Sequence, residues 1–149
     1  MAASGGLLPF DLRPKGYSFA DAQQMLNALS VEGTEFYMNI QAGMLDMIFP
    51  VLLFLTLALA YWLLMPEKWG RWRFLVVLIA LPGSVFDYLE NFSIIKMLEL
   101  GADNITVQNV ICASTNSSYK SIFVTISLVV LLALIALWFV RKYVSKNKQ

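Results

Sequence analysis

The chain has 149 residues, 58% of them hydrophobic and 14% charged, and its mean hydropathy of +0.65 is high for a soluble domain. The formal net charge of +1 argues against nucleic acid as a partner. Histidine is absent and Cys112 is the single cysteine, which excludes an intramolecular disulfide and removes the commonest metal ligand and general base. We therefore expect neither a metal site nor a cofactor.

Residues 1–17 are predicted to form an irregular N-terminal segment. They contain Pro9, Asp11, Pro14 and Gly16 and no apolar run of the length that a cleavable signal peptide needs. We expect the first membrane span to act as the targeting signal instead.

Residues 18–41 are predicted to form an amphipathic lead-in helix. Ser18 is a suitable N-cap and Asp21 follows in the capping-box position. Apolar side chains then recur at helical spacing through Leu29, and Gly33 is expected to interrupt the helix. The favoured interpretation is a helix packed on the outer surface of a membrane bundle, and the alternative is a lid over a site.

Residues 42–144 are predicted to form a bundle of three membrane spans, at about 44–65, 72–98 and 119–142. Residues 47–65 and 121–140 carry no charge and are each long enough to cross a bilayer. In the second span only residues 74–86 are uncharged, about 20 Å of helix against a hydrocarbon core of roughly 30 Å. This span must therefore carry acidic residues at or near membrane depth, which insertion disfavours unless there is a local reason.

The charges predict an orientation. The link at 66–73 holds three basic residues and one acidic residue, and the tail after Val140, including residues 145–149, is basic with no acid. Residues 1–46 hold five acidic residues and two basic ones. By the positive-inside bias, this is an integral membrane protein with its N-terminus and the 99–118 loop outside and its C-terminus in the cytoplasm.

A polar layer is predicted near the outer boundary. Asp87, Glu90 and Asn91 share one face of the second span, with Ser84 one turn earlier. Counting 1.5 Å per residue along antiparallel spans brings Asp46 and Lys120 to the same depth. We expect Lys120 to pair with Glu90 or Asp87, or with Asp46 across the bundle.

The third span adds a stripe of small hydroxyl side chains at helical spacing, which would let another helix approach closely. The stripe consists of Ser114, Ser118, Ser121 and Thr125. Pro50 and Pro82 lie within about a turn of the acidic positions and can kink their helices there.

Three functions remain open for this layer. It could bind or transport a cation, a proton or a polar lipid-like small molecule in an outward-facing acidic pocket. It could instead fix helix register in a non-catalytic accessory or assembly subunit, or its paired carboxylates could act as acid and base in a small membrane enzyme. The sequence favours a protein without catalytic activity. The predicted ligand-binding residues are Asp46, Asp87, Glu90, Asn91, Lys120, Ser84, Ser121 and Thr125.

The run from Leu81-Pro82 to Phe86-Asp87-Tyr88-Leu89-Glu90-Asn91, with Asp46-Met-Ile-Phe-Pro50 upstream, resembles a family of small polytopic membrane proteins. Its members carry an Asp-x-x-Glu-Asn motif on the second span and a lead-in similar to Gly16-Tyr17-Ser18. The resemblance covers residues 12–142 and implies the fold and the motif, but no activity.

The sequence thus predicts an all-α integral membrane protein with three transmembrane helices and an N-terminal amphipathic helix packed on the bundle. The expected partners are the lipid bilayer and a small-molecule or cation ligand. The hydroxyl stripe also suggests a homo-oligomer or a larger membrane partner.

Overall fold

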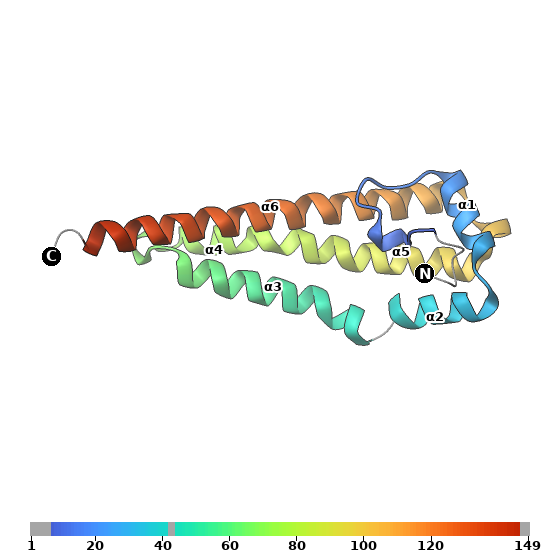
Figure 1. The fold of residues 1–149 in the computed structure, drawn as a ribbon, viewed down its shortest axis with the longest axis horizontal. Coiled ribbons are helices and arrows are strands. Elements are labelled where there is room, and N and C mark those ends of the chain that lie inside the picture. The colour runs from blue at the N-terminus through green and yellow to red at the C-terminus, as the bar shows by residue number, and fades with distance from the viewer. Residues whose placement is uncertain (1–6, 42–43, 147–149) are drawn as a thin grey trace.

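The computed structural model describes residues 7–41 and 44–146. Within these ranges the chain is all-helical and has no strand. Three segments are long and apolar enough to cross a membrane: Asp46–Leu64, Trp72–Asn104 and Val107–Val144. They lie side by side as an elongated bundle (Figure 1).

The bundle is built on three long helices: α3 (Met44–Leu64), α5 (Leu81–Asn104) and α6 (Val107–Lys146). Helix α5 packs against both α3 and α6 and runs antiparallel to each (Figure 1). A short helix α4 (Trp72–Val77) and a 3-10 turn (Leu78–Ala80) precede α5, and this turn falls where Pro82 has no N–H to donate to the carbonyl of Leu78.

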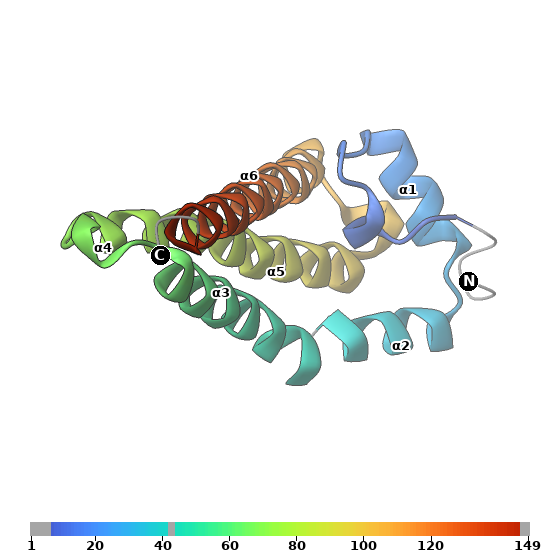
Figure 2. The same cartoon turned by 60° about the vertical axis from the view of Figure 1, so that its left-hand side comes forward.

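The two ends of the bundle differ in what they carry. The connection from α3 to α4, which includes a 3-10 turn (Glu67–Trp69), lies at the same end as the C-terminus of α6. We call this the link end. The N-terminal segment with α1 (Phe19–Ala28) and α2 (Val31–Gln41) gathers around the other end, the N-terminal end (Figures 1 and 2).

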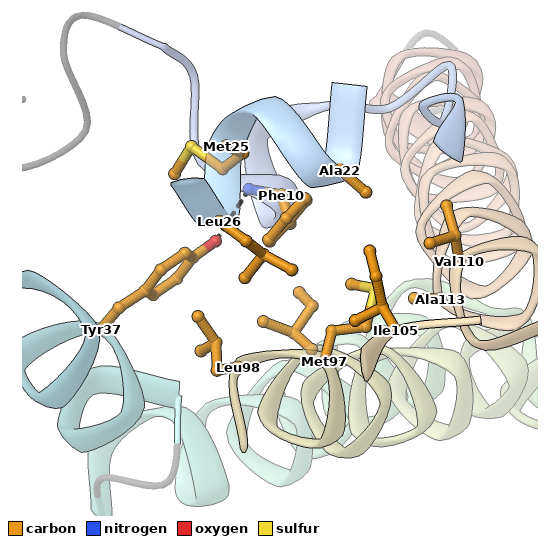
Figure 3. Packing of buried hydrophobic residues seen from close by; sticks show 11 residues of the cluster. Phe10, Ala22, Met25, Leu26, Tyr37, Met97, Leu98, Ile105, Val110 and Ala113 are labelled. Carbon is orange, nitrogen blue, oxygen red and sulfur yellow. Dashed lines mark hydrogen bonds between the residues drawn. The ribbon is translucent and has the colours of Figure 1, made fainter. Parts of the chain in front are cut away.

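The N-terminal end is held by a cluster of buried apolar side chains from six parts of the chain (Figure 3). Phe10, from a 3-10 turn (Phe10–Leu12), is fully buried, and its backbone N–H donates to the hydroxyl of Tyr37 on α2 at 2.7 Å. The other members of the cluster come from α1, α5, the α5–α6 connection and α6: Ala22, Met25, Leu26, Ile94, Met97, Leu98, Ile105, Val110 and Ala113.

This cluster explains why helices α5 and α6 are longer than the predicted spans. The spans at 72–98 and 119–142 lie within longer helical segments, and the loop expected at 99–118 is helical except at Ile105 and Thr106. Ile105, Val110 and Ala113 bury their side chains in the cluster, so packing maintains helix where the sequence is too polar to predict a span. Gly101, with φ +70°, kinks the last turn of α5.

The lead-in is interrupted as predicted, but not at Gly33. It forms two helices, and the break falls at Leu29 and Ser30. Ser30 accepts a hydrogen bond from the Gly33 N–H at 3.0 Å, and the hydroxyl of Thr34 donates to the Ser30 carbonyl. Ser30 thus closes the first turn of α2, which makes it the breakpoint, and Gly33 lies inside the helix. The predicted capping box at Ser18 and Asp21 is confirmed.

A second apolar cluster fills the link end, formed by Leu57, Tyr61, Met65, Ala80 and Leu134. The Tyr61 hydroxyl donates to the carbonyl of Ser127 at 2.5 Å. Two arginines from other helices cap the end of α3: Arg73 donates to the Trp62 carbonyl and Arg141 to the Leu64 carbonyl.

Candidate functional site: an acidic pocket at the N-terminal end of the bundle

Lys120 of α6 joins two carboxylates of α5. Its Nζ lies 2.8 Å from Asp87 Oδ1 and 2.6 Å from Glu90 Oε2, which confirms the predicted pairing. Asp87 and Glu90 are 3% and 1% exposed, so the two carboxylates are shielded from solvent, whereas Lys120 is partly exposed. Within the described ranges, Asp87 Oδ2 and Glu90 Oε1 are buried without a hydrogen-bond partner. Lys120 therefore satisfies only one oxygen of each carboxylate.

Three polar side chains of α5 bind the backbone of α3 around its proline. Ser84 Oγ donates to the Pro50 carbonyl at 2.7 Å, and the Tyr88 hydroxyl donates to the Met47 carbonyl. Asn91 Nδ2 donates to the Asp46 carbonyl at 3.5 Å. Pro50 has no N–H, so the Asp46 carbonyl four residues earlier loses its helical partner. These contacts join the two helices at the place where α3 lacks a backbone hydrogen bond.

A cavity of about 230 Å³ lies beside this seam. It is lined by Asp11, Asp46, Phe49, Asp87, Asn91 and Lys120. The residues come from the N-terminal segment, α3, α5 and α6, so the cavity exists only when all four parts are assembled. We call it the acidic pocket.

Asp11 is held at the acidic pocket by Tyr37. The Tyr37 hydroxyl donates to Asp11 Oδ1 at 2.8 Å while it accepts from the Phe10 N–H. Burial raises the pKa of Tyr37, and the neighbouring Asp11 carboxylate raises it further. The phenol therefore stays protonated and remains a donor to Asp11 at physiological pH.

A second, adjoining cavity of about 190 Å³ shares Asp11 and Lys120 with the acidic pocket. Its other lining residues are Pro14, Ser117, Ser121, Val124 and Thr125. The Thr125 hydroxyl donates to the Ser121 carbonyl at 2.7 Å within its own helix. Two of the predicted hydroxyl residues thus line this neighbouring cavity and not the acidic pocket.

The first two residues of the hydroxyl stripe, Ser114 and Ser118, are covered by the chain's own N-terminal segment. The Tyr17 N–H donates to Ser114 Oγ at 2.8 Å. Gly16 has φ +78°, and a Cβ atom there would lie 2.4 Å from Ser114 Oγ. Only glycine suits both this backbone conformation and this close approach. The stripe was predicted to pack against another helix, but at Ser114 and Ser118 it receives an irregular segment.

The predicted site residues therefore separate into three groups. Asp46, Asp87, Asn91 and Lys120 line the acidic pocket, and Glu90 joins them through Lys120. Ser121 and Thr125 line the adjoining cavity, and Ser84 is bound to the α3 backbone.

Sequence analysis missed Asp11, Phe49 and Tyr37. Asp11 and Tyr37 precede the spans, and no periodicity relates them to the polar layer. Phe49 could have been found, because it lies one turn after Asp46 on the same helix.

Chemically, the cluster holds four carboxylates, from Asp11, Asp46, Asp87 and Glu90, and one ammonium group. Among the described residues, no group of three or more His, Cys, Asp or Glu side chains is arranged to hold a metal ion. The pocket combines an excess of negative charge with one aromatic ring, that of Phe49.

Comparisons with protein-family models, curated proteins and solved structures find no match for this chain.

Proposed function

We propose that this chain is an integral membrane protein whose acidic pocket faces outward and binds a small organic cation, such as a free amine or the ammonium group of a lipid-like molecule. The observation that carries the proposal is the charge of the pocket. Three carboxylates line it, and the one lysine among them is already shared by Asp87 and Glu90. A cation would relieve the repulsion among acids that Lys120 cannot neutralise.

Membrane insertion with this orientation is supported by the separation of charge along the bundle. The link end carries Lys68, Arg71 and Arg73 and also the basic end of α6. The N-terminal end carries the acidic pocket and most of the acidic residues of residues 1–46. The positive-inside bias then sets the link end in the cytoplasm.

An organic cation fits the pocket better than a proton path. Phe49 adds an aromatic ring to the carboxylates, and aromatic faces attract ammonium groups. Towards the link end the described bundle is filled by the apolar cluster around Leu57, Tyr61 and Leu134. Binding at the outer end is therefore the function that this arrangement favours, in preference to conduction through the bundle.

A second candidate is an accessory subunit whose polar layer fixes helix register. The seam of Ser84, Tyr88 and Asn91 on the α3 backbone favours it, since each contact depends on one alignment of α3 with α5. This role explains the seam but not the acidic lining of the neighbouring cavity. Catalysis is not proposed, because both α5 carboxylates are engaged by Lys120.

The test is thermal unfolding of the full-length protein in detergent, with choline chloride or ethanolamine hydrochloride against sodium chloride at equal ionic strength. A ligand at one hundred times its Kd stabilises the folded state by about 2.7 kcal/mol. We expect the organic cations to raise the unfolding temperature of the wild type by several degrees and sodium to have little effect. Asp46→Asn should remove this shift, because it deletes a lining charge that Lys120 does not hold.

Asp103→Asn is the matched control, since it removes one acidic charge from an exposed position outside the pocket. It should retain the full shift. Phe49→Leu should weaken the effect of choline if the aromatic ring contributes. Equal shifts in the wild type, Asp46→Asn and Asp103→Asn would reject the pocket and leave the register role as the better explanation.

A further inference from the structure

A groove lies at the link end, the opposite end of the bundle from the acidic pocket. It has a volume of about 330 Å³ and lies between the end of α3, the connection to α4 and the last turns of α6. Its lining residues are Leu63, Met65, Pro66, Glu67, Trp138, Arg141 and Lys142. We call it the basic groove.

The basic groove carries two cationic side chains and one carboxylate. Among the described residues, only Lys120 makes ion pairs, so neither Arg141 nor Lys142 is neutralised by Glu67. The groove is thus positive and open to an anion, whereas the acidic pocket selects the opposite charge.

The Arg141 guanidinium is held in place, but not all of its N–H groups have a hydrogen-bond acceptor. One Nη donates to the Leu64 carbonyl, which holds the guanidinium at the end of α3. Its Nε is buried and has no acceptor in the described part of the chain. A buried donor without an acceptor is unfavourable, and a guanidinium with free N–H groups matches the oxygens of a phosphate group.

The residues around Arg141 favour the phosphate group of a lipid over free phosphate. Lys142 Nζ lies 4.8 Å from the centre of the Trp138 ring, and tryptophan marks the level of lipid headgroups in membrane proteins. Leu63, which lines the same groove, is 69% exposed and would face an acyl chain. The groove thus places the cationic Lys142 near the apolar Leu63, and a phospholipid has an anionic headgroup next to its apolar chains.

We propose that the basic groove binds the phosphate group of an anionic phospholipid of the cytoplasmic leaflet. Arg141 and Lys142 bind the phosphate oxygens, and the exposed side chain of Leu63 contacts the first carbons of the acyl chain. The choice of leaflet rests on the orientation proposed above, but the groove is separate from the acidic pocket, so lipid binding and cation binding can fail independently.

The experiment titrates the full-length protein in detergent with short-chain phosphatidylglycerol, short-chain phosphatidylcholine and inorganic phosphate, and follows thermal stability to obtain an apparent Kd. Phosphatidylglycerol should bind more tightly than phosphatidylcholine. Lys142→Gln should weaken phosphatidylglycerol binding about fivefold, the value of one basic residue near an anionic lipid. Lys142 is chosen because Arg141 also caps α3, and its loss would confuse binding with stability.

Two further variants complete the design. Glu67→Gln removes the only carboxylate of the groove and should tighten binding of phosphatidylglycerol. Lys68→Gln removes an equal charge at an exposed neighbouring position outside the groove and should leave the apparent Kd within about twofold. Equal losses for Lys142→Gln and Lys68→Gln would overturn the site. If inorganic phosphate displaced phosphatidylglycerol with an equal apparent Kd, the proposal that a lipid occupies the groove would be overturned.

Discussion

Lys120 is the residue on which the polar layer depends, since it serves two buried carboxylates at once. Replacing it with methionine leaves both acids uncompensated. Breaking a buried pair costs about 3–5 kcal/mol, and because the Lys120 side chain is 25% exposed we expect about 3 kcal/mol for Lys120→Met. Adding Glu90→Gln should restore part of this loss, because it removes one of the two stranded charges.

The measurement is a double-mutant cycle on the free energy of unfolding in detergent. Lys96→Met is the control, because Lys96 is an exposed lysine on α5 and no ion pair joins it to a carboxylate in the described structure. It should change stability by less than about 0.5 kcal/mol. Additive effects of Lys120→Met and Glu90→Gln would mean that Lys120 does not couple to the acid.

For individual residues, helix geometry predicted much of the candidate site. The spacing of Asp87, Glu90 and Asn91 and the antiparallel connectivity were sufficient to bring Lys120 to the same layer. Ser84 lies one turn before Asp87 as predicted, but its hydroxyl donates to a carbonyl of α3, because periodicity identifies a face and not the atom that a side chain binds. Asp11 was missed because it reaches the pocket through tertiary packing of an irregular segment.

Among the elements, α1 offers a local test. Ser18 accepts from the Asp21 N–H, and Asp21 Oδ2 accepts from the Ser18 N–H at 2.9 Å. The hydrogen bond from the Ser18 hydroxyl, together with that from its N–H, lowers the pKa of Asp21 below its ordinary value. Ser18→Ala should destabilise the first turn of α1 by about 1 kcal/mol, seen as faster amide hydrogen exchange there.

The same pair predicts a pH dependence. A lowered folded-state pKa means that the carboxylate stabilises the cap above its unfolded-state pKa, and that this contribution disappears as the pH falls through the lower folded-state value. Exchange protection in the first turn, corrected for intrinsic rates, should therefore fall in this acidic range in the wild type. In Ser18→Ala the fall should begin at higher pH, and a pH profile identical to that of the wild type would contradict the role of Ser18.

The element boundaries were harder to predict than the elements themselves. Gly33 suggested the break, but the break falls at Leu29 and Ser30, and the Gly33 N–H donates to the Ser30 side chain inside the first turn of α2. The extension of α5 and α6 through 99–118 was not predictable, because it is stabilised by burial of Ile105 and Val110 beneath α1, a contact between distant parts of the chain.

For the whole molecule, the single cysteine provides a test of orientation. Cys112 is exposed on α6, eight residues before Lys120, which is about 12 Å further towards the N-terminal end. A membrane-impermeant maleimide should label Cys112 from outside intact cells. In a Cys112→Ser background, Lys68→Cys at the link end should be labelled only after permeabilisation. The reverse pattern would invert the proposed topology and place the acidic pocket in the cytoplasm.

The contact of Tyr17 with Ser114 has a consequence for biosynthesis. It joins positions 97 residues apart, so a segment that leaves the ribosome first meets a helix that is made last. Until α6 is complete, Asp87 and Glu90 have no Lys120, the Tyr17 N–H lacks its acceptor Ser114, and the apolar cluster around Phe10 lacks Val110 and Ala113. A nascent chain that stops at Asn104 therefore carries two acids without Lys120 on α5 and an apolar cluster that lacks its α6 members. The charge pairing and the apolar cluster are therefore both completed by α6, the last helix of the chain.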